Sequence, residues 1–224
     1  MIRGIVSIAL LVALAVLLPL LFGELMLDAL ERLHLSPRVA LTLFLAMLVG
    51  GLVNLPVKTI VREFDVTYHP LAVFGLGGLF PQLERVRRET VIAVNLGGCV
   101  IPVGLAVYQA YHLFLQSPRT LIVCGVGALA NVFVCFRVAR PVPDVGIVMP
   151  TFVSPLIAAA IALVFAPEAA APVAFVVGVM GPLIGADLLH LRDLDSYSTG
   201  VMSIGGAGTF DGIVLSGILA AYLA

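Results

Sequence analysis

The sequence predicts an all-α polytopic membrane protein of about seven transmembrane helices with a small cytoplasmic β-hairpin. Three observations support this fold class: 61% of the 224 residues are hydrophobic, only 11% are charged, and long apolar segments recur along the chain. A soluble domain has about 45–50% apolar and about 25% charged residues, so a soluble enzyme and a disordered chain are excluded. The net charge of −1 gives no reason to expect a nucleic-acid partner.

The first two spans are predicted at residues 5–24 and 38–55, where the chain is almost continuously apolar. A transmembrane helix needs about 20 mostly apolar residues to cross about 30 Å of hydrocarbon. The second span begins after Ser36-Pro37, and proline is favoured in the first turn of a helix. We therefore expect a helical pair at the start of the chain.

A soluble insertion is predicted at residues 57–89. Its first part, residues 59–68, is rich in β-branched and aromatic side chains, which is typical of a strand. Proline and glycine interrupt the segment that follows, at positions 70, 75, 77, 78 and 81. We expect a small β-hairpin that lies on the cytoplasmic face of the membrane.

Five more apolar segments complete the predicted bundle. They occupy residues 90–115, 119–136, 150–166, 170–190 and 201–223. The segment at 150–166 is short and rich in alanine, whereas the others approach the length that a membrane requires. We expect residues 1–224 to form one integral membrane domain in contact with lipid, and a homo-oligomer is compatible with this chain length.

The distribution of Lys and Arg predicts the orientation, because positively charged loops stay on the cytoplasmic side. Nine of these residues fall on one side of the predicted spans: Arg3, Lys58, Arg62, Arg85, Arg87, Arg88, Arg137, Arg140 and Arg192. Three fall on the other side: Arg32, Arg38 and Arg119. We therefore expect a multi-pass protein of the cell inner (plasma) membrane, with a cytoplasmic N-terminus and a C-terminus outside.

Two acidic residues, Asp187 and Asp211, fall inside predicted spans, whereas the other acids lie in loops or at interfaces. An ionisable side chain at the centre of a membrane costs about 2.5–3.5 kcal/mol or more, so it indicates function by default. The sixth and seventh spans form an antiparallel pair, which lets both carboxylates approach the same face. Two neighbouring carboxylates do not both ionise easily, so one holds a proton while the other activates water. We predict Asp187 and Asp211 as catalytic residues of an aspartyl-protease-like hydrolase that needs no cofactor and no metal.

The residues before Asp211 are predicted to shape the active-site cleft. Gly205, Gly206, Gly208 and Thr209 precede this aspartate, and glycine permits close approach of the backbone. Unwound backbone at membrane depth is tolerated only where it is buried in protein or lines a wet cavity. We therefore expect the segment 203–210 to be extended or broken.

The run from Gly206 to Ala220 resembles the Gly-x-Gly-Asp segment of presenilin- and signal-peptide-peptidase-type intramembrane proteases. In that family the second catalytic aspartate begins a helix, and Asp187-Leu188 resembles the other half of the pair. The resemblance implies proteolysis of a transmembrane peptide. This chain departs from the motif because Thr209 and Phe210 separate the second glycine from the aspartate and Ala186 replaces a tyrosine.

Over its whole length the chain also resembles a prokaryotic multi-pass family known only as domain of unknown function 1614. Three segments carry this resemblance: Arg140–Ile147, Ile184–Leu188 and Ser203–Ile213. The family resemblance implies a multi-pass membrane protein and no particular activity.

A metal-dependent alternative uses His190, three residues after Asp187 and therefore on the same helical face. Asp187, His190 and Asp211, with His69 or Asp65 from the hairpin, provide carboxylate and imidazole ligands that suit zinc or iron. This set would make the protein a membrane metallohydrolase.

A transport alternative, as a small-molecule or ion transporter or channel, uses three asparagines in or near the spans, Asn54, Asn95 and Asn131. With His190 they are candidates for lining a polar cavity. The segment from Asn95 to Pro102 contains two glycines and a proline, which is typical of a helix that breaks to expose its backbone. A non-catalytic scaffold is a further alternative.

Overall fold

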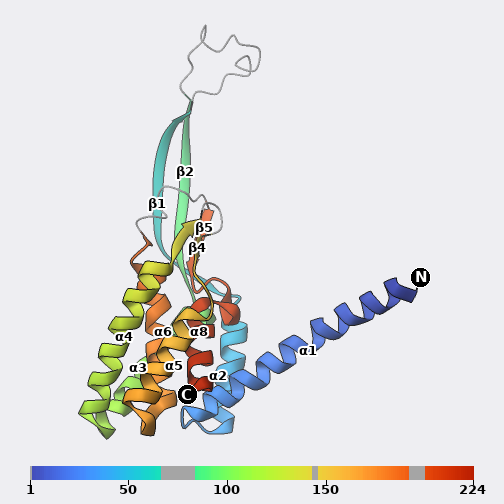
Figure 1. Cartoon of the computed structure of the whole chain (residues 1–224). Helices are drawn as coiled ribbons and strands as arrows, with labels where there is room; N and C mark the ends of the chain where they lie inside the picture. The colour runs from blue at the N-terminus through green and yellow to red at the C-terminus, as the bar shows by residue number, and fades with distance from the viewer. Residues whose placement is uncertain (1, 67–83, 143–145, 192–199) are drawn as a thin grey trace.

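The computed structural model describes residues 2–66, 84–142, 146–191 and 200–224. Within these ranges, seven helices alternate in direction between two ends of a bundle (Figure 1). The helices are α1 (Ile2–Arg32), α2 (Pro37–Gly50), α3 (Ile101–Gln116), α4 (Pro118–Val138), α5 (Val153–Phe165), α6 (Ala170–Met180) and α8 (Gly212–Leu223). They correspond one to one with the seven predicted apolar segments.

Three helical stretches of the described chain are long and apolar enough to cross a membrane: Leu96–Gln116, Pro118–Val138 and Pro167–Leu188. The predominantly helical architecture is therefore confirmed, and these three stretches are consistent with a membrane protein. Helices α2, α5 and α8 are apolar but have only 14, 13 and 12 residues, which corresponds to about 18 to 21 Å at about 1.5 Å per residue. These three are shorter than the spans predicted from the sequence, so seven full-length spans are not what the structure contains.

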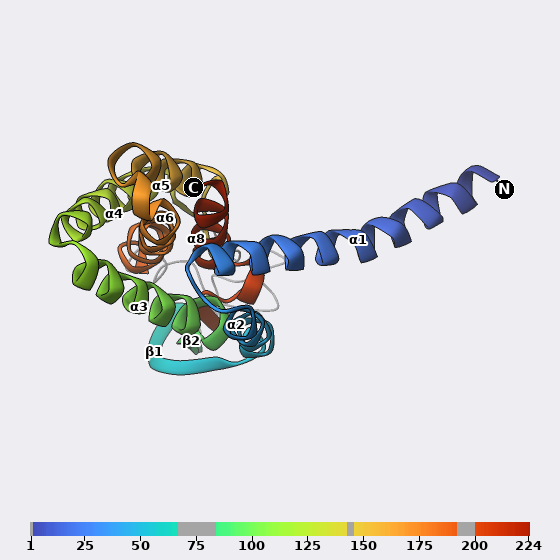
Figure 2. The same ribbon diagram turned by 90° about the horizontal axis from the view of Figure 1, so that it is seen from below.

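Helix α6 forms the centre of the bundle. It contacts α3, α4, α5 and α8, which surround it when the bundle is seen from one end (Figure 2). Every residue from Pro172 to Val179 is buried. An all-apolar helix of this kind is typical of a core position, and its continuation carries Asp187 to one end of the bundle.

The hairpin is confirmed, but its strands are longer than predicted and are joined by a third. Strand β1 (Asn54–Val66) pairs antiparallel with β2 (Glu84–Asn95), and β2 pairs in parallel with β5 (Gly200–Ile204). The hairpin stands away from the bundle instead of lying on its surface (Figure 1). Residues 90–95 and 201–202 were expected to be helical, whereas 203–204 belong to the segment that was expected to be extended or broken; apolar, β-branched side chains suit a strand as well as a buried helix.

A second, short hairpin follows α4 at the same end of the bundle as the long one. Its strands are β3 (Arg140–Val142) and β4 (Gly146–Val148), which pair antiparallel. This end of the bundle therefore carries all the described strands.

Candidate functional site

Asp187 and Asp211 lie at the end of the bundle that carries the sheet. Asp187 belongs to a π-helical segment, η5 (Gly181–Leu188), which continues α6. Asp211 is the N-cap residue of α8. Both residues are half-buried, and their carboxylates are close enough to interact electrostatically. The structure thus brings together the two acids that the sequence singled out.

Main-chain N–H groups from one loop face both carboxylates. The N–H of Ile213 donates to Oδ1 of Asp211 over 3.0 Å, and that of Ala207 donates to Oδ2 over 3.4 Å. The N–H of Gly205 is a hydrogen-bond donor to Asp187. Asp211 therefore also has a structural role, because an N-cap carboxylate satisfies the first N–H groups of its helix.

The loop before Asp211 is broken, as predicted for residues 203–210. Strand β5 ends at Ile204, and a short 3₁₀ helix, η6 (Gly208–Phe210), precedes α8. Gly205 and Gly208 have φ values of +73° and +62°, a conformation that side chains other than glycine rarely adopt. Thr209 is buried and Gly206 is exposed.

Two glycine pairs lie against this loop, and only the second of them was noted from the sequence, as part of a breakable helix. They are Gly50-Gly51 at the end of α2 and Gly97-Gly98 in a π-helical turn, η3 (Leu96–Val100). A Cβ atom on Gly98 would lie 2.0 Å from the carbonyl oxygen of Gly205, and one on Gly51 would lie 3.2 Å from Cα of Gly208. The loop is therefore held by direct contact of backbone with backbone, which only glycine permits here.

Asn95 and Asn54 fix the base of the hairpin to the same loop. The Asn95 amide donates to the carbonyl oxygen of Gly51 over 2.8 Å and to Oδ1 of Asn54 over 3.0 Å, and its own oxygen accepts from the N–H of Gly98 over 2.7 Å. The Ser203 hydroxyl donates to the same Asn54 oxygen over 2.5 Å. These two asparagines therefore hold the base of the hairpin against α2, η3 and β5, and their role in lining a polar cavity stays a prediction.

Cys99 lies within electrostatic range of the two acids. The residue is buried in η3 and is close enough to interact electrostatically with both Asp187 and Asp211. The other two cysteines, Cys124 and Cys135, are also buried, and neither forms a disulfide. The glycines before Cys99 are the sequence signal that would have placed it near the loop.

Asn131 belongs to a separate buried network between helices. Its amide donates over 2.9 Å to the Ser154 hydroxyl and over 2.9 Å to the carbonyl oxygen of Val177, and Ser154 is 2.5 Å from the hydroxyl of Ser216. The network joins α4, α5, α6 and α8. Its members are buried and hydrogen-bonded to one another, so Asn131 stabilises the bundle and is not grouped with the acids.

Replacement of Asn131 by alanine is expected to lower the free energy of unfolding by about 1–2 kcal/mol, because interhelical hydrogen bonds are lost in a membrane. The measurement is reversible unfolding in bicelles. Gly125→Ala, on the same helix and with open space at its Cβ position, is the matched control and should be neutral or slightly stabilising. Equal stability of the two variants would contradict a role for the network.

The His190 side chain packs against α4. Its Nδ1 lies 3.1 Å from the carbonyl oxygen of Gly185 and 3.0 Å from that of Ala186, and its ring is 4.8 Å from that of Phe136. Among the described residues, no group of three or more His, Cys, Asp or Glu side chains could hold a metal ion. The alternative metal set of Asp187, His190 and Asp211 is therefore not formed; His69 and the side chain of Asp65 lie outside the described residues.

Comparison with known proteins identifies one family model. The model described as "Protein of unknown function (DUF1614)" matches residues 48–223, a range that contains the hairpin, both acids and both glycine pairs. No curated protein and no solved structure matches the chain. The comparisons therefore do not show the resemblance to intramembrane aspartyl proteases.

Proposed function

Because the chain belongs to the family described as "Protein of unknown function (DUF1614)", whose description assigns no activity, we propose a function from the site itself. The protein is a membrane-embedded hydrolase, similar to intramembrane aspartyl proteases, that cleaves a transmembrane peptide. Asp187 and Asp211 are its catalytic pair. One observation carries this proposal: two half-buried carboxylates lie within electrostatic range of one another, and one glycine-rich loop donates the N–H of Gly205 to Asp187 and that of Ala207 to Asp211.

The chemistry follows from the coupling of the two acids. Repulsion between neighbouring carboxylates favours a pair that shares one proton. The ionised partner takes a proton from water, and the resulting oxygen nucleophile attacks the peptide carbonyl carbon. The protonated partner donates a hydrogen bond to the carbonyl oxygen. The C–N bond then breaks, and the leaving amine takes up a proton from the pair of acids. This sequence consumes one water molecule and uses no group beyond the two acids.

The glycine loop gives the cleft its shape in this proposal. Gly205 and Gly208 hold the left-handed turns that bring the chain from β5 to Asp211, and Gly206 is exposed. An exposed main chain without a Cβ atom leaves room for a substrate backbone. Thr209 is buried and supports the loop from within.

We place the strand-bearing end of the bundle in the cytoplasm and the protein in the cell inner membrane. Three positive side chains lie at this end: Lys58 on β1, Arg137 in the last turn of α4 and Arg140 on β3. Arg38 and Arg119 lie in the first turns of α2 and α4 at the other end. The larger number of positive charges along the sequence on the strand-bearing side supports this orientation.

The proposal is tested by replacing Asp187 with asparagine in protein reconstituted with a single-span peptide substrate. The change keeps the size of the side chain but removes the ionisable group, so cleavage should be lost while the fold is retained. The measurement is product formation by mass spectrometry, with Glu168→Gln, an exposed acid far from the pair, as the matched control. Cleavage at the wild-type rate in Asp187→Asn would overturn the proposal.

A second candidate, proton-coupled transport, is favoured by the two π-helical segments η3 and η5 that flank the acids. Segments of this kind are frequent at functional sites, and broken helices hold ions in transporters. This candidate predicts proton flux into liposomes that Asp187→Asn abolishes, with no peptide product.

A further inference from the structure

Helix α1 consists of two parts that differ in their surroundings. Its C-terminal part packs on α2 and α8, and Met26, Ala29 and Leu30 there have no exposed surface. Its N-terminal part projects away from the bundle (Figures 1 and 2), and Leu17, Leu18, Leu20 and Leu21 are 53–61% exposed. The change from exposed to buried falls near residue 22.

The junction between the two parts contains the residues that weaken a helix most. Pro19 lies inside α1, where it removes one backbone hydrogen bond and favours a kink. Gly23 follows four residues later and lowers helix stability relative to alanine. The N-terminal part of α1 can therefore change its angle to the bundle at residues 19–23 without unfolding the packed part.

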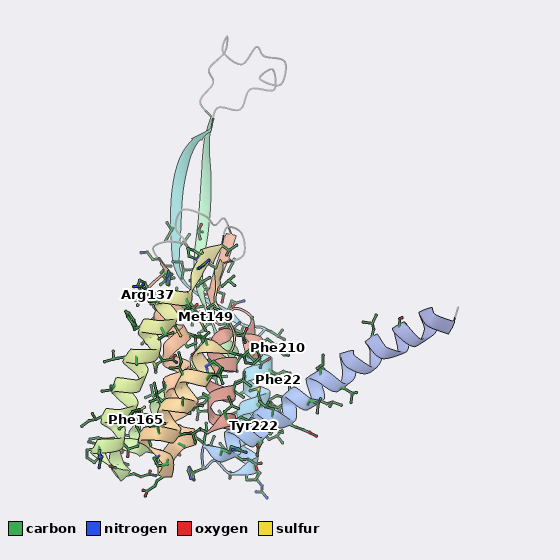
Figure 3. All side chains as sticks on the ribbon, in the orientation of Figure 1. Phe22, Arg137, Met149, Phe165, Phe210 and Tyr222 are labelled. Carbon is green, nitrogen blue, oxygen red and sulfur yellow. The ribbon has the colours of Figure 1, made fainter. Side chains whose placement is uncertain are left out.

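Phe22 lies within this junction and connects it to the proposed active site. Its ring stacks on that of Phe210, with ring centroids 4.9 Å apart and planes inclined by 25°. The two rings lie close together on the flank of the bundle (Figure 3). Phe210 is the residue directly before Asp211, and its side chain is 59% exposed. The stacked pair therefore lies between the outer surface of the bundle and the loop that precedes Asp211.

We propose that the Phe22–Phe210 stack is a latch on a lateral entrance to the two-aspartate site. Movement of α1 about residues 19–23 separates the two rings and lets an apolar helical segment of a substrate approach Asp211 from the membrane. The inference rests on the proposed hydrolase function. A single stacked pair suits a latch, because it excludes lipid when closed and opens without disturbing the packed part of α1.

The latch is tested by joining its two sides. In the variant Phe22→Cys/Phe210→Cys, a short bismaleimide links the two positions; the three native cysteines are buried. Closing a gate that limits access should slow cleavage of a membrane-spanning substrate at least about tenfold. Cleavage of a short soluble peptide with the same sequence should be unchanged, because it reaches the acids from the aqueous end of the bundle.

The matched control joins α1 to α8 at the other end of the bundle, away from Phe22 and Phe210. Arg32 lies over the ring of Tyr222 at 5.1 Å, so Arg32→Cys/Tyr222→Cys can be linked by the same reagent. This linked control should cleave both substrates at the unlinked rate. Cleavage of the membrane-spanning substrate at the unlinked rate by the Phe22–Phe210 linked variant would overturn the latch.

A second measurement separates failure of the latch from failure of the hydrolase function. Spin labels at Leu18→Cys and Ile122→Cys, both exposed, report the distance between α1 and α4. Addition of the membrane-spanning peptide should shift this distance in wild-type background and not in the Phe22–Phe210 linked protein. A shift in distance without cleavage would contradict the hydrolase function and support the latch. The absence of a shift would contradict the latch.

Discussion

Replacement of Asp211 by asparagine is expected to abolish cleavage while leaving the protein folded. Asp211 accepts a hydrogen bond from the N–H of Ile213 over 3.0 Å as the N-cap of α8, and asparagine caps a helix about as well as aspartate. The variant therefore keeps the cap and loses only the ionisable group. Loss of a general acid or base reduces the rate by about 10²- to 10⁴-fold. The measurement is initial cleavage rate in liposomes together with the free energy of unfolding.

Asp211→Ala is the comparison that separates the two roles of this residue. It removes the cap as well as the acid, so it should lose the same activity and also about 1 kcal/mol of stability. If Asp211→Asn kept more than half of the wild-type rate, Asp211 would be a structural cap and not a catalytic residue.

Replacement of Gly98 by alanine is expected to have the largest effect on stability. The added Cβ atom would lie 2.0 Å from the Gly205 carbonyl oxygen and 2.9 Å from that of Gly208. Both neighbours are backbone atoms, so neither can turn aside, and the loop before Asp211 must move. We expect a loss of about 3 kcal/mol or more, at the upper end of the cost of overpacking, measured by reversible unfolding in bicelles.

Gly104→Ala in α3 is the matched control for Gly98→Ala. Apart from the adjoining residues and the nearby backbone of its own helix, no atom of the described chain lies within 4 Å of the Cβ position at Gly104, and alanine is the better helix former by about 1 kcal/mol. The control should therefore be neutral or slightly stabilising. A Gly98→Ala protein as stable as this control would show that the two backbones can separate at no cost.

The membrane class and the broken segment before Asp211 could be predicted from the sequence because both depend on local properties. Apolar length identifies helices that suit a membrane, and the glycines at 205, 206 and 208 indicate backbone that is not helical. The strands at residues 90–95 and 200–204 could not be predicted in the same way. A short apolar segment rich in β-branched residues fits a buried helix or a strand, and its partner decides which forms.

The segments that pack against the loop before Asp211 could not be predicted from the sequence either. Gly50-Gly51 and Gly97-Gly98 are visible as pairs, but glycine is common in membrane helices for several reasons. Which backbone approaches each pair depends on how α2, η3 and η6 come together. Similarly, Asn54, Asn95 and Asn131 looked alike in the sequence, and the structure assigns the first two to the loop and the third to the helical core.

The parallel pairing of β2 with β5 has a consequence for biosynthesis. The bond from Ser203 to Asn54 joins residues separated by 149 positions, and the loop that faces both acids contacts backbone made some hundred residues earlier. A nascent chain folds from its N-terminus onward, so helices α1 to α6 and the long hairpin are synthesised before β5 can pair with β2. The two acids are thus brought together only after α8 has left the ribosome, so on the proposed function a chain that has not reached α8 lacks the complete pair during insertion.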